Sequence, residues 1–131
     1  MRRLSWLVLA VLLILLVGCG SREVKLDIAN NGGAVRLSAG QVLAITLEGN
    51  PSTGYGWYVV GELPGNLEQQ GEPEFKADAG SANRVGAGGM LTNRFKALVA
   101  GSSELTLGYM RSWEDKAPEK TFKVTVEVTE K

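Results

Sequence analysis

The chain has 131 residues, of which 44% are hydrophobic and 21% charged, and 14 basic and 14 acidic residues give a formal net charge of +0. One domain fits this length, and balanced charge offers no basic surface for a nucleic acid, so we expect no nucleic acid partner. The absence of histidine and the single cysteine exclude a Ser/His/Asp or Cys/His catalytic site, a histidine-rich zinc site and an internal disulfide. We therefore expect a binding protein that is not an enzyme and needs no metal or cofactor.

The first 18 residues have the pattern of an export signal. A basic start, residues 1–3, precedes an apolar run at residues 4–17, which is shorter than the about 20 residues that span a membrane. The sequence Leu16-Val17-Gly18-Cys19 resembles the bacterial lipoprotein signal, in which a peptidase cuts before the cysteine and the sulfur carries a diacylglycerol. The alternatives are an ordinary signal peptide with an incidental cysteine and a short anchor helix.

This resemblance implies a lipoprotein signal peptide at residues 1–18, lipidation at Cys19, and a short tether through residue 23. The protein would be exported and held by its lipid on a bacterial membrane, either at the periplasmic face of the outer membrane or at the outer face of the cytoplasmic membrane. Each buried CH₂ group adds about 0.8 kcal/mol of membrane affinity, so acyl chains can anchor a domain without a spanning helix.

Residues 24–131 form the predicted domain, where apolar residues recur with a period of two, as in strands with one buried face. Residues 120–129 show the clearest alternation, with Phe122, Val124, Val126 and Val128 on one side. Strands are expected near 24–28, 34–37, 41–48, 55–60, 72–76, 91–99, 103–110 and 120–129. Turn-forming residues separate these segments, and none has the pattern of a long amphipathic helix.

Two other predicted strands also have an apolar inner row. The first has Val24, Leu26 and Ile28 on one side. The strand near 91–99 places Leu91, Phe95, Ala97 and Val99 inward, and Asn93 interrupts that row.

About seven or eight short strands predict an all-β fold, an immunoglobulin-like antiparallel β-sandwich. A small barrel is the alternative architecture. If the strands run up and down, the connections after residues 48, 76 and 110 all emerge at the same end of the sandwich. We expect one such domain, acting as a monomer.

Those three connections contain the motifs Asn50-Pro51-Ser52-Thr53-Gly54-Tyr55, Gly86-Ala87-Gly88-Gly89 and Arg111-Ser112-Trp113. In order and approximate spacing they resemble the chagasin family of cysteine protease inhibitors, whose pattern is Asn-Pro-Thr-Thr-Gly-Tyr/Phe, Gly-X-Gly-Gly and Arg-Pro-Trp/Phe. The second motif matches fully. Ser52 replaces a family threonine, and Ser112 replaces a proline that would fix one φ angle of the third loop.

The resemblance implies reversible, competitive inhibition of papain-like cysteine proteases, with the three loops forming a wedge that occludes the active-site cleft. All residues of the three motifs are then expected to contact the protease. Ser52 and Thr53 would supply contacts rather than chemistry. Trp113 would lie against an aromatic wall of the protease, and Arg111 would stack or pair with a carboxylate.

The residue types of the motifs suit a stiff binding surface. Asn50 can close an Asx turn, Pro51 fixes φ, and Gly54 permits positive φ, which together lower the ordering cost of binding. The glycines of the second motif allow close backbone approach. They do not suit phosphate binding, because a strand follows them where such a site needs a helix N-terminus.

Other aromatic and charged residues near the motifs have simpler interpretations. Trp57 is expected in the core, as in many immunoglobulin-like domains, whereas Tyr55 and Tyr109 suit either the sandwich edge or the interface. The polar residues that follow Trp113 are expected to form a solvated rim; they include Asp115, Lys116 and Glu119.

Two other functions remain open at this stage. A lipid-anchored interaction or adhesion module of the cell envelope would use another surface of the same sandwich and tolerate changes in the motifs. A hydrolase would need a nucleophile with an acid–base pair, and the carboxylates are scattered singly through the sequence.

Overall fold

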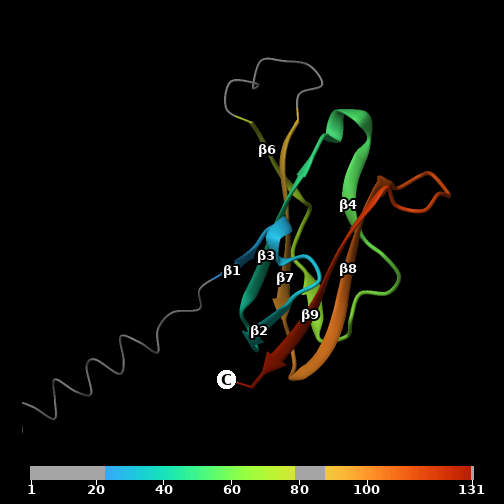
Figure 1. Ribbon diagram of the computed structural model, residues 1–131. Coiled ribbons are helices and arrows are strands. Elements are labelled where there is room, and N and C mark those ends of the chain that lie inside the picture. The colour runs from blue at the N-terminus through green and yellow to red at the C-terminus, as the bar shows by residue number, and fades with distance from the viewer. Residues whose placement is uncertain (1–22, 79–87, 131) are drawn as a thin grey trace, which may run out of the picture.

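The computed structural model of the protein describes residues 23–78 and 88–130, which contain nine strands and two short 3-10 helices (Figure 1). In chain order they are β1 (Val24–Leu26), η1 (Ile28–Asn30), β2 (Ala34–Ser38), β3 (Val42–Gly49), η2 (Pro51–Thr53), β4 (Tyr55–Val59), β5 (Leu67–Gln69), β6 (Glu74–Ala77), β7 (Gly89–Ala97), β8 (Gly101–Arg111) and β9 (Lys120–Thr129). The predicted lipidation site Cys19 and the motif residues Gly86 and Ala87 lie outside the described residues.

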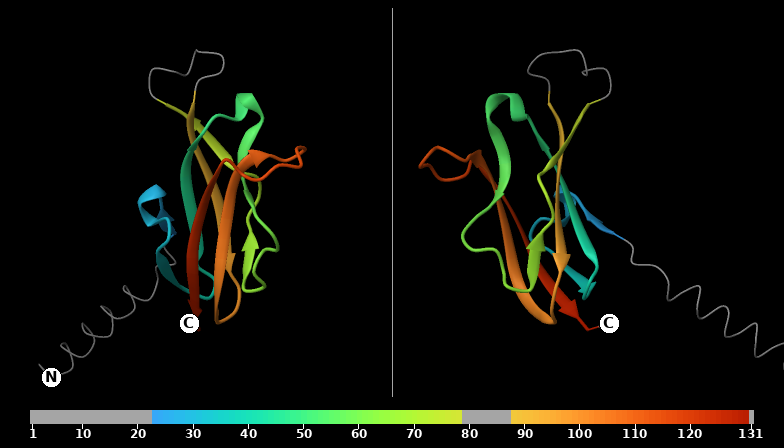
Figure 2. Two further views of the ribbon diagram at one scale, coloured as in Figure 1. Left: turned by 45° about the vertical axis from the view of Figure 1, so that its right-hand side comes forward. Right: turned by 180° about the vertical axis from the view of Figure 1, so that it is seen from behind.

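The strands form two sheets that pack face to face, which confirms the predicted immunoglobulin-like sandwich (Figure 2). One sheet has the order β1-β3-β7-β5, and β6 pairs with another part of β7 on the same edge as β5. The other sheet has the order β2-β9-β8-β4. Most pairs are antiparallel, as expected. The two N-terminal strands are exceptions, because β1 runs parallel to β3 and β2 runs parallel to β9.

Three details of the predicted strands are corrected by the structure. Strand β5 was not expected, because three residues are too few to show a period of two. Ile28 is 62% exposed, since the first strand ends at Leu26 and Asp27 then caps η1 by accepting a hydrogen bond from the Ala29 amide. Val99 is 59% exposed because β7 ends at Ala97.

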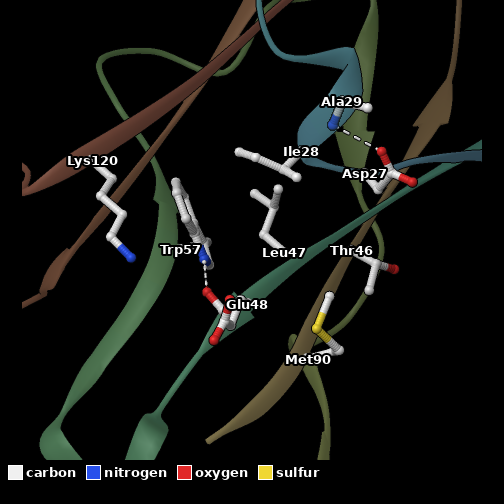
Figure 3. A pocket seen from close by; sticks show the side chains of 9 residues that line it. All are labelled: Asp27, Ile28, Ala29, Thr46, Leu47, Glu48, Trp57, Met90 and Lys120. Atoms are coloured by element: carbon white, nitrogen blue, oxygen red, sulfur yellow. Dashed lines mark hydrogen bonds between the residues drawn. The ribbon is translucent and has the colours of Figure 1, made fainter.

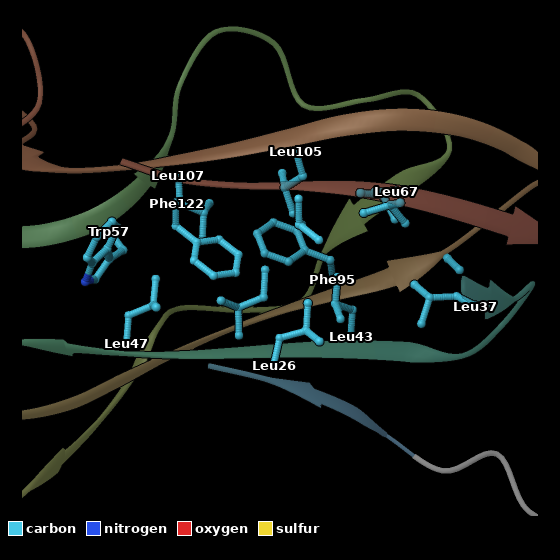
Figure 4. Close-up of a cluster of buried hydrophobic side chains, with 14 of the residues drawn as sticks. Leu26, Leu37, Leu43, Leu47, Trp57, Leu67, Phe95, Leu105, Leu107 and Phe122 are labelled. Carbon is cyan, nitrogen blue, oxygen red and sulfur yellow. The ribbon is translucent and has the colours of Figure 1, made fainter. Parts of the chain in front are cut away.

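The core lies between the sheets and consists mainly of the predicted inward rows (Figure 4). Phe95 of β7 and Phe122 of β9 are fully buried among leucines and valines. Asn93, the polar interruption, is buried as well, and its amide donates to the Trp57 carbonyl oxygen at 3.4 Å and accepts from Gln69 at 3.3 Å. Both bonds satisfy the buried amide, and the bond to Trp57 of β4 also joins the two sheets.

The register of the strands brings the three motif-bearing connections to one end of the sandwich. In one sheet Gly89 pairs with both Gly49 and Ala77, so that the end of β3, the end of β6 and the start of β7 are neighbours. In the other sheet Tyr55 pairs with Arg111, and Tyr109 pairs with Lys120. The predicted common end is therefore confirmed for the described parts of these connections.

Candidate functional site

The first motif forms a single 3-10 turn that is fixed by its own side chains. Asn50 is the N-cap of η2, and its side-chain oxygen accepts from the Ser52 amide at 3.2 Å and from the Ser52 hydroxyl at 2.6 Å. The Thr53 hydroxyl donates to the Asn50 carbonyl oxygen at 2.6 Å. Pro51 begins the turn, and Gly54 ends it with a φ of +84°. The predicted Asx turn and positive φ are confirmed.

Aromatic residues hold the base of this turn. The Asn50 amide donates to the Tyr109 hydroxyl at 3.0 Å, and the Tyr109 ring stacks on Tyr55 with 5.1 Å between centroids. Trp57 is 3% exposed, as predicted for a core residue, and its indole N–H donates to the Glu48 carbonyl oxygen at 3.0 Å (Figure 3). This bond ties β4 to β3 across the sandwich, so the two strands that carry the turn keep a fixed separation.

An open hollow of about 510 Å³ lies beside the bond between Trp57 and Glu48 (Figure 3). Its walls are mainly apolar and include Ile28 of η1, Leu47 of β3 and Met90 of β7. No described residue of the three motifs lines it. Within residues 23–78 and 88–130, no group of three or more histidine, cysteine or acidic side chains is placed to hold a metal ion.

The second motif is described only at Gly88 and Gly89. Gly89 is buried at the start of β7, and a Cβ atom there would overlap the Lys76 carbonyl oxygen and come within 2.8 Å of a Phe75 ring carbon. The carbonyl oxygen of Gly88 accepts from the Asp78 amide at 3.3 Å. Gly89 is thus required by the packing of β6 on β7, a structural reason that its sequence context did not indicate.

Trp113, in the third motif, is 70% exposed. Its six-membered ring rests against Gly54 of the first motif, because a Cβ atom on Gly54 would overlap Cη2 of Trp113 and lie 2.9 Å from Cζ2. The two loops are therefore in direct contact. Glycine at position 54 provides both the backbone conformation and the space for the indole.

Arg111 joins the same two loops. Its Nε donates to the Thr53 carbonyl oxygen at 2.9 Å, its Nη1 donates to Glu114 at 2.8 Å, and its guanidinium lies 4.5 Å from the centre of the Tyr55 ring. The hydrogen bond to Glu114 raises the pKa of Arg111. Arg111 thus makes both kinds of expected contact, stacking and carboxylate pairing, within the protein itself.

Two acidic residues of the β8–β9 loop contact this cluster. Glu114 pairs with Arg111 and, through its other oxygen, with Lys116 at 3.2 Å; the hydrogen bond from Arg111 is the main cause of a lowered Glu114 pKa. Glu119 accepts from the Tyr55 hydroxyl at 2.8 Å and thereby raises the pKa of Tyr55. Lys116 and Glu119 are exposed, as expected for a rim, but both have partners in the site.

Glu114 belongs to the site, although its sequence pattern did not indicate this. The Glu114 amide donates to the Arg111 carbonyl oxygen at 3.3 Å, so these residues are the first and fourth of a turn. First and fourth residues of a β-turn lie close together. The spacing of three residues between Arg111 and Glu114 was the sequence feature that could have indicated this pair. It predicts proximity only where the segment forms a turn.

Comparisons with known proteins agree with the fold and the motifs. The sequence profile of the family described as chagasin family peptidase inhibitor I42 matches residues 36–126. Amoebiasin-1 of Entamoeba histolytica is 31% identical over 99 residues, which cover 76% of this chain and 93% of that protein. Chagasin of Trypanosoma cruzi is 34% identical over 95 residues, covering 68% of this chain and 82% of chagasin.

A solved structure is similar over most of the chain. The crystal structure of a cysteine protease inhibitor from Entamoeba histolytica superimposes with a TM-score of 0.64 at 25% identity, and the match covers 82% of this chain and 95% of that one. The region matched by the family profile contains all three motifs.

Proposed function

Because this chain belongs to the chagasin family of peptidase inhibitors, we propose that it is a reversible, competitive inhibitor of papain-like cysteine proteases. The observation that supports this most is the clustering of the first and third motifs at one end of the sandwich, where Trp113 is exposed directly beside the η2 turn. We assign contact with the protease to all residues of the three motifs. No residue acts as a nucleophile.

The η2 turn suits insertion into a narrow cleft. Pro51, Ser52 and Thr53 are small and exposed, and the two hydroxyl groups already donate hydrogen bonds to Asn50. Their conformations are therefore set before binding, so that less side-chain entropy is lost when the protease is bound. Trp113 adds a large apolar surface next to the turn, and tryptophan is enriched among residues that dominate binding energy.

The inhibition test uses papain and a chromogenic peptide substrate. Competitive inhibition requires that higher substrate concentrations weaken the inhibition, and reversibility requires that activity return after dilution. Mass spectrometry after long incubation should find the chain intact between Asn50 and Tyr55. A covalent adduct, or one cut in that loop per protease molecule inhibited, would contradict the mechanism.

The wedge is tested by Trp113→Ala with Val99→Ala as its control. Val99 is also exposed but follows β7 at the opposite end of the sandwich. Trp113→Ala should raise the inhibition constant about 30-fold or more, the loss typical of an interface anchor, with an unchanged melting temperature. Val99→Ala should change neither quantity. Equal inhibition by both variants would favour an interaction module that uses another surface.

We also propose that Cys19 carries the lipid that anchors the exported protein to a bacterial membrane. The sequence Leu16-Val17-Gly18-Cys19, after a basic start and an apolar run, supports this. No helix within the described residues is long and apolar enough to cross a membrane. Cys19→Ser should prevent both processing and incorporation of a labelled fatty acid. A Cys19→Ser protein that is processed and sediments with membranes like the parent would contradict the assignment.

A further inference from the structure

We propose that Glu114 is a positioning residue of the inhibitory end, which we define as η2, Gly54 and residues 111–114. Through Arg111, Glu114 holds the β8–β9 loop against the η2 turn, so that the two loops meet the protease as one preassembled unit. The proposal rests on the proposed inhibitory function and adds to it a residue that lies outside the three motifs.

Arg111 contacts both of the loops that carry the first and third motifs. Arg111 is the last residue of β8 and pairs with Tyr55 in the sheet. Two of its side-chain contacts, the Thr53 carbonyl oxygen and the Tyr55 ring, belong to the first motif, and the third, Glu114, belongs to its own loop. The guanidinium is thus the link between the two loops.

Arg111 is in turn held by two hydrogen bonds of unequal strength. A long arginine side chain loses considerable rotamer entropy when it is fixed, and one bond to a neutral carbonyl offsets only part of this loss. The bond to Glu114 is charge-assisted and therefore stronger. With Nε on Thr53 and Nη1 on Glu114, the guanidinium is held at two points over the Tyr55 ring.

Glu114 is itself held by its backbone amide and by both of its carboxylate oxygens. Its amide donates to the Arg111 carbonyl oxygen at 3.3 Å, which closes a turn around Ser112 and Trp113. One carboxylate oxygen bonds to Arg111 and the other pairs with Lys116, and the Glu114 side chain is 20% exposed. Lys116 is 79% exposed, so its pair is screened by water and contributes less than the pair with Arg111.

The pair between Arg111 and Glu114 also affects the binding surface around Trp113. Trp113 lies inside the turn that Glu114 closes, and its ring rests on Gly54, the neighbour of Thr53. Fixing Arg111 on the Thr53 carbonyl therefore also fixes the seat of the indole. Ser112 leaves one φ angle of this turn free where a proline would fix it, and the pair between Arg111 and Glu114 constrains the turn instead.

Another carboxylate acts on the same cluster from the far end of the loop. Glu119 accepts a hydrogen bond from the Tyr55 hydroxyl and so keeps the ring beneath the guanidinium of Arg111. Arg111, Lys116 and Tyr55 interact electrostatically with Glu114, and Glu119 interacts with Tyr55 and Arg111. Of these, Arg111 alone bonds both to Glu114 and to the first motif.

The test compares Glu114→Ala and Glu114→Gln with the control Asp115→Asn. All three variants remove one negative charge, but Glu114→Gln keeps an acceptor oxygen at position 114 and Glu114→Ala does not. The first measurement is the NMR signal of the Arg111 Nε–H group, which needs no protease. It should exchange with water fastest and be most mobile in Glu114→Ala, be intermediate in Glu114→Gln, and match the parent in Asp115→Asn.

The second measurement is inhibition of papain by the same variants. Glu114→Ala should raise the inhibition constant by about five- to tenfold, less than the full contribution of a buried charge-assisted hydrogen bond because the pair is partly exposed. Glu114→Gln should raise it by less, and Asp115→Asn not at all. A parent-like Arg111 signal in Glu114→Ala would overturn the proposal, and so would equal losses in Glu114→Gln and Asp115→Asn, which would indicate charge rather than position. If the parent itself does not inhibit, the proposed function fails, and the NMR comparison still decides whether Glu114 positions Arg111.

Discussion

Gly54 ends the η2 turn with a φ of +84° and lies directly under the ring of Trp113. An L-amino acid at this φ pays a backbone cost, and any Cβ would also displace the indole. Gly61 has a similar φ of +77°, but no atom lies within 4 Å of the position that its Cβ would take. The two glycines therefore separate the cost of the backbone conformation from the effect on Trp113.

Gly54→Ala should weaken inhibition of papain about tenfold or more, because the anchor is displaced from its seat. Gly61→Ala should leave the inhibition constant unchanged. Both variants should lose about 1–2 kcal/mol of stability through the left-handed conformation. Inhibition constants and urea unfolding of the two variants provide the comparison, and equal inhibition by both would show that the contact between Trp113 and Gly54 has no role in binding.

Tyr55 gives the site a dependence on alkaline pH. Its hydrogen bond to Glu119 raises its pKa above 10.0, so the protonated phenol is the form that the folded protein stabilises. The contribution of this hydrogen bond to folding stability is fully present below pH 10.0 and is lost as the pH rises through the folded-state pKa.

Glu119→Gln should lower the pH at which Tyr55 ionises, which can be followed by the ultraviolet absorbance of tyrosinate. Glu104→Gln, at an exposed acid elsewhere on β8, should leave the titration unchanged; identical curves for both variants would refute the assigned cause.

At the scale of the elements, a strand could be predicted from the sequence when one of its faces is buried and the other is exposed over several residues. Strand β9 shows a clean alternation because it has one buried and one exposed face, and its predicted bounds are those observed. Strand β5 buries only Leu67 and leaves no periodic pattern. The parallel pairings of β1 with β3 and of β2 with β9 were not predicted either, because the residue pattern of one strand does not specify the direction of its partner.

In the candidate site, features that depend on neighbouring residues could be predicted, and contacts between distant residues could not. The turn at Asn50 to Gly54 was predictable because its caps and φ values depend on local residue types. The contacts of Arg111 with Thr53 and of Tyr55 with Glu119 were not, because they join residues far apart in sequence and depend on the shape of a loop. The structural need for Gly89 likewise comes from the packing of β6.

Truncating a side chain of β4 should destabilise the fold strongly on its buried face and only weakly on its exposed face. Trp57→Ala removes a buried side chain that touches Tyr109 and bonds to the Glu48 carbonyl, and should cost about 3–5 kcal/mol of unfolding free energy. Tyr58→Ala changes the next residue, which is partly exposed, and should cost less. Urea unfolding measures both. A larger loss for Tyr58→Ala would mean that the inward face of β4 has been misassigned.

At the scale of the whole molecule, the two ends of the sandwich have different roles in the proposed function. The motifs lie where β3 and β8 end, whereas the described chain begins near the start of β3: Val24 pairs with Leu43, and Glu23 pairs with Arg94 at 3.0 Å. The described chain therefore begins nearer the end opposite the motifs. A membrane anchor before residue 23, as proposed above, is compatible with an inhibitory end that stays free to meet a protease.

NMR mapping with isotope-labelled inhibitor and unlabelled papain tests most directly which surface of the protein binds papain. We expect amide shifts or broadening to concentrate at residues 52–54, 88 and 112–114, while residues 98–101, at the turn before β8, stay unchanged. Papain whose active-site cysteine carries a bulky alkyl group should produce no such changes. Perturbation confined to residues 98–101 or to the sheet faces, or equal perturbation by the blocked enzyme, would contradict cleft occlusion by the motif-bearing end.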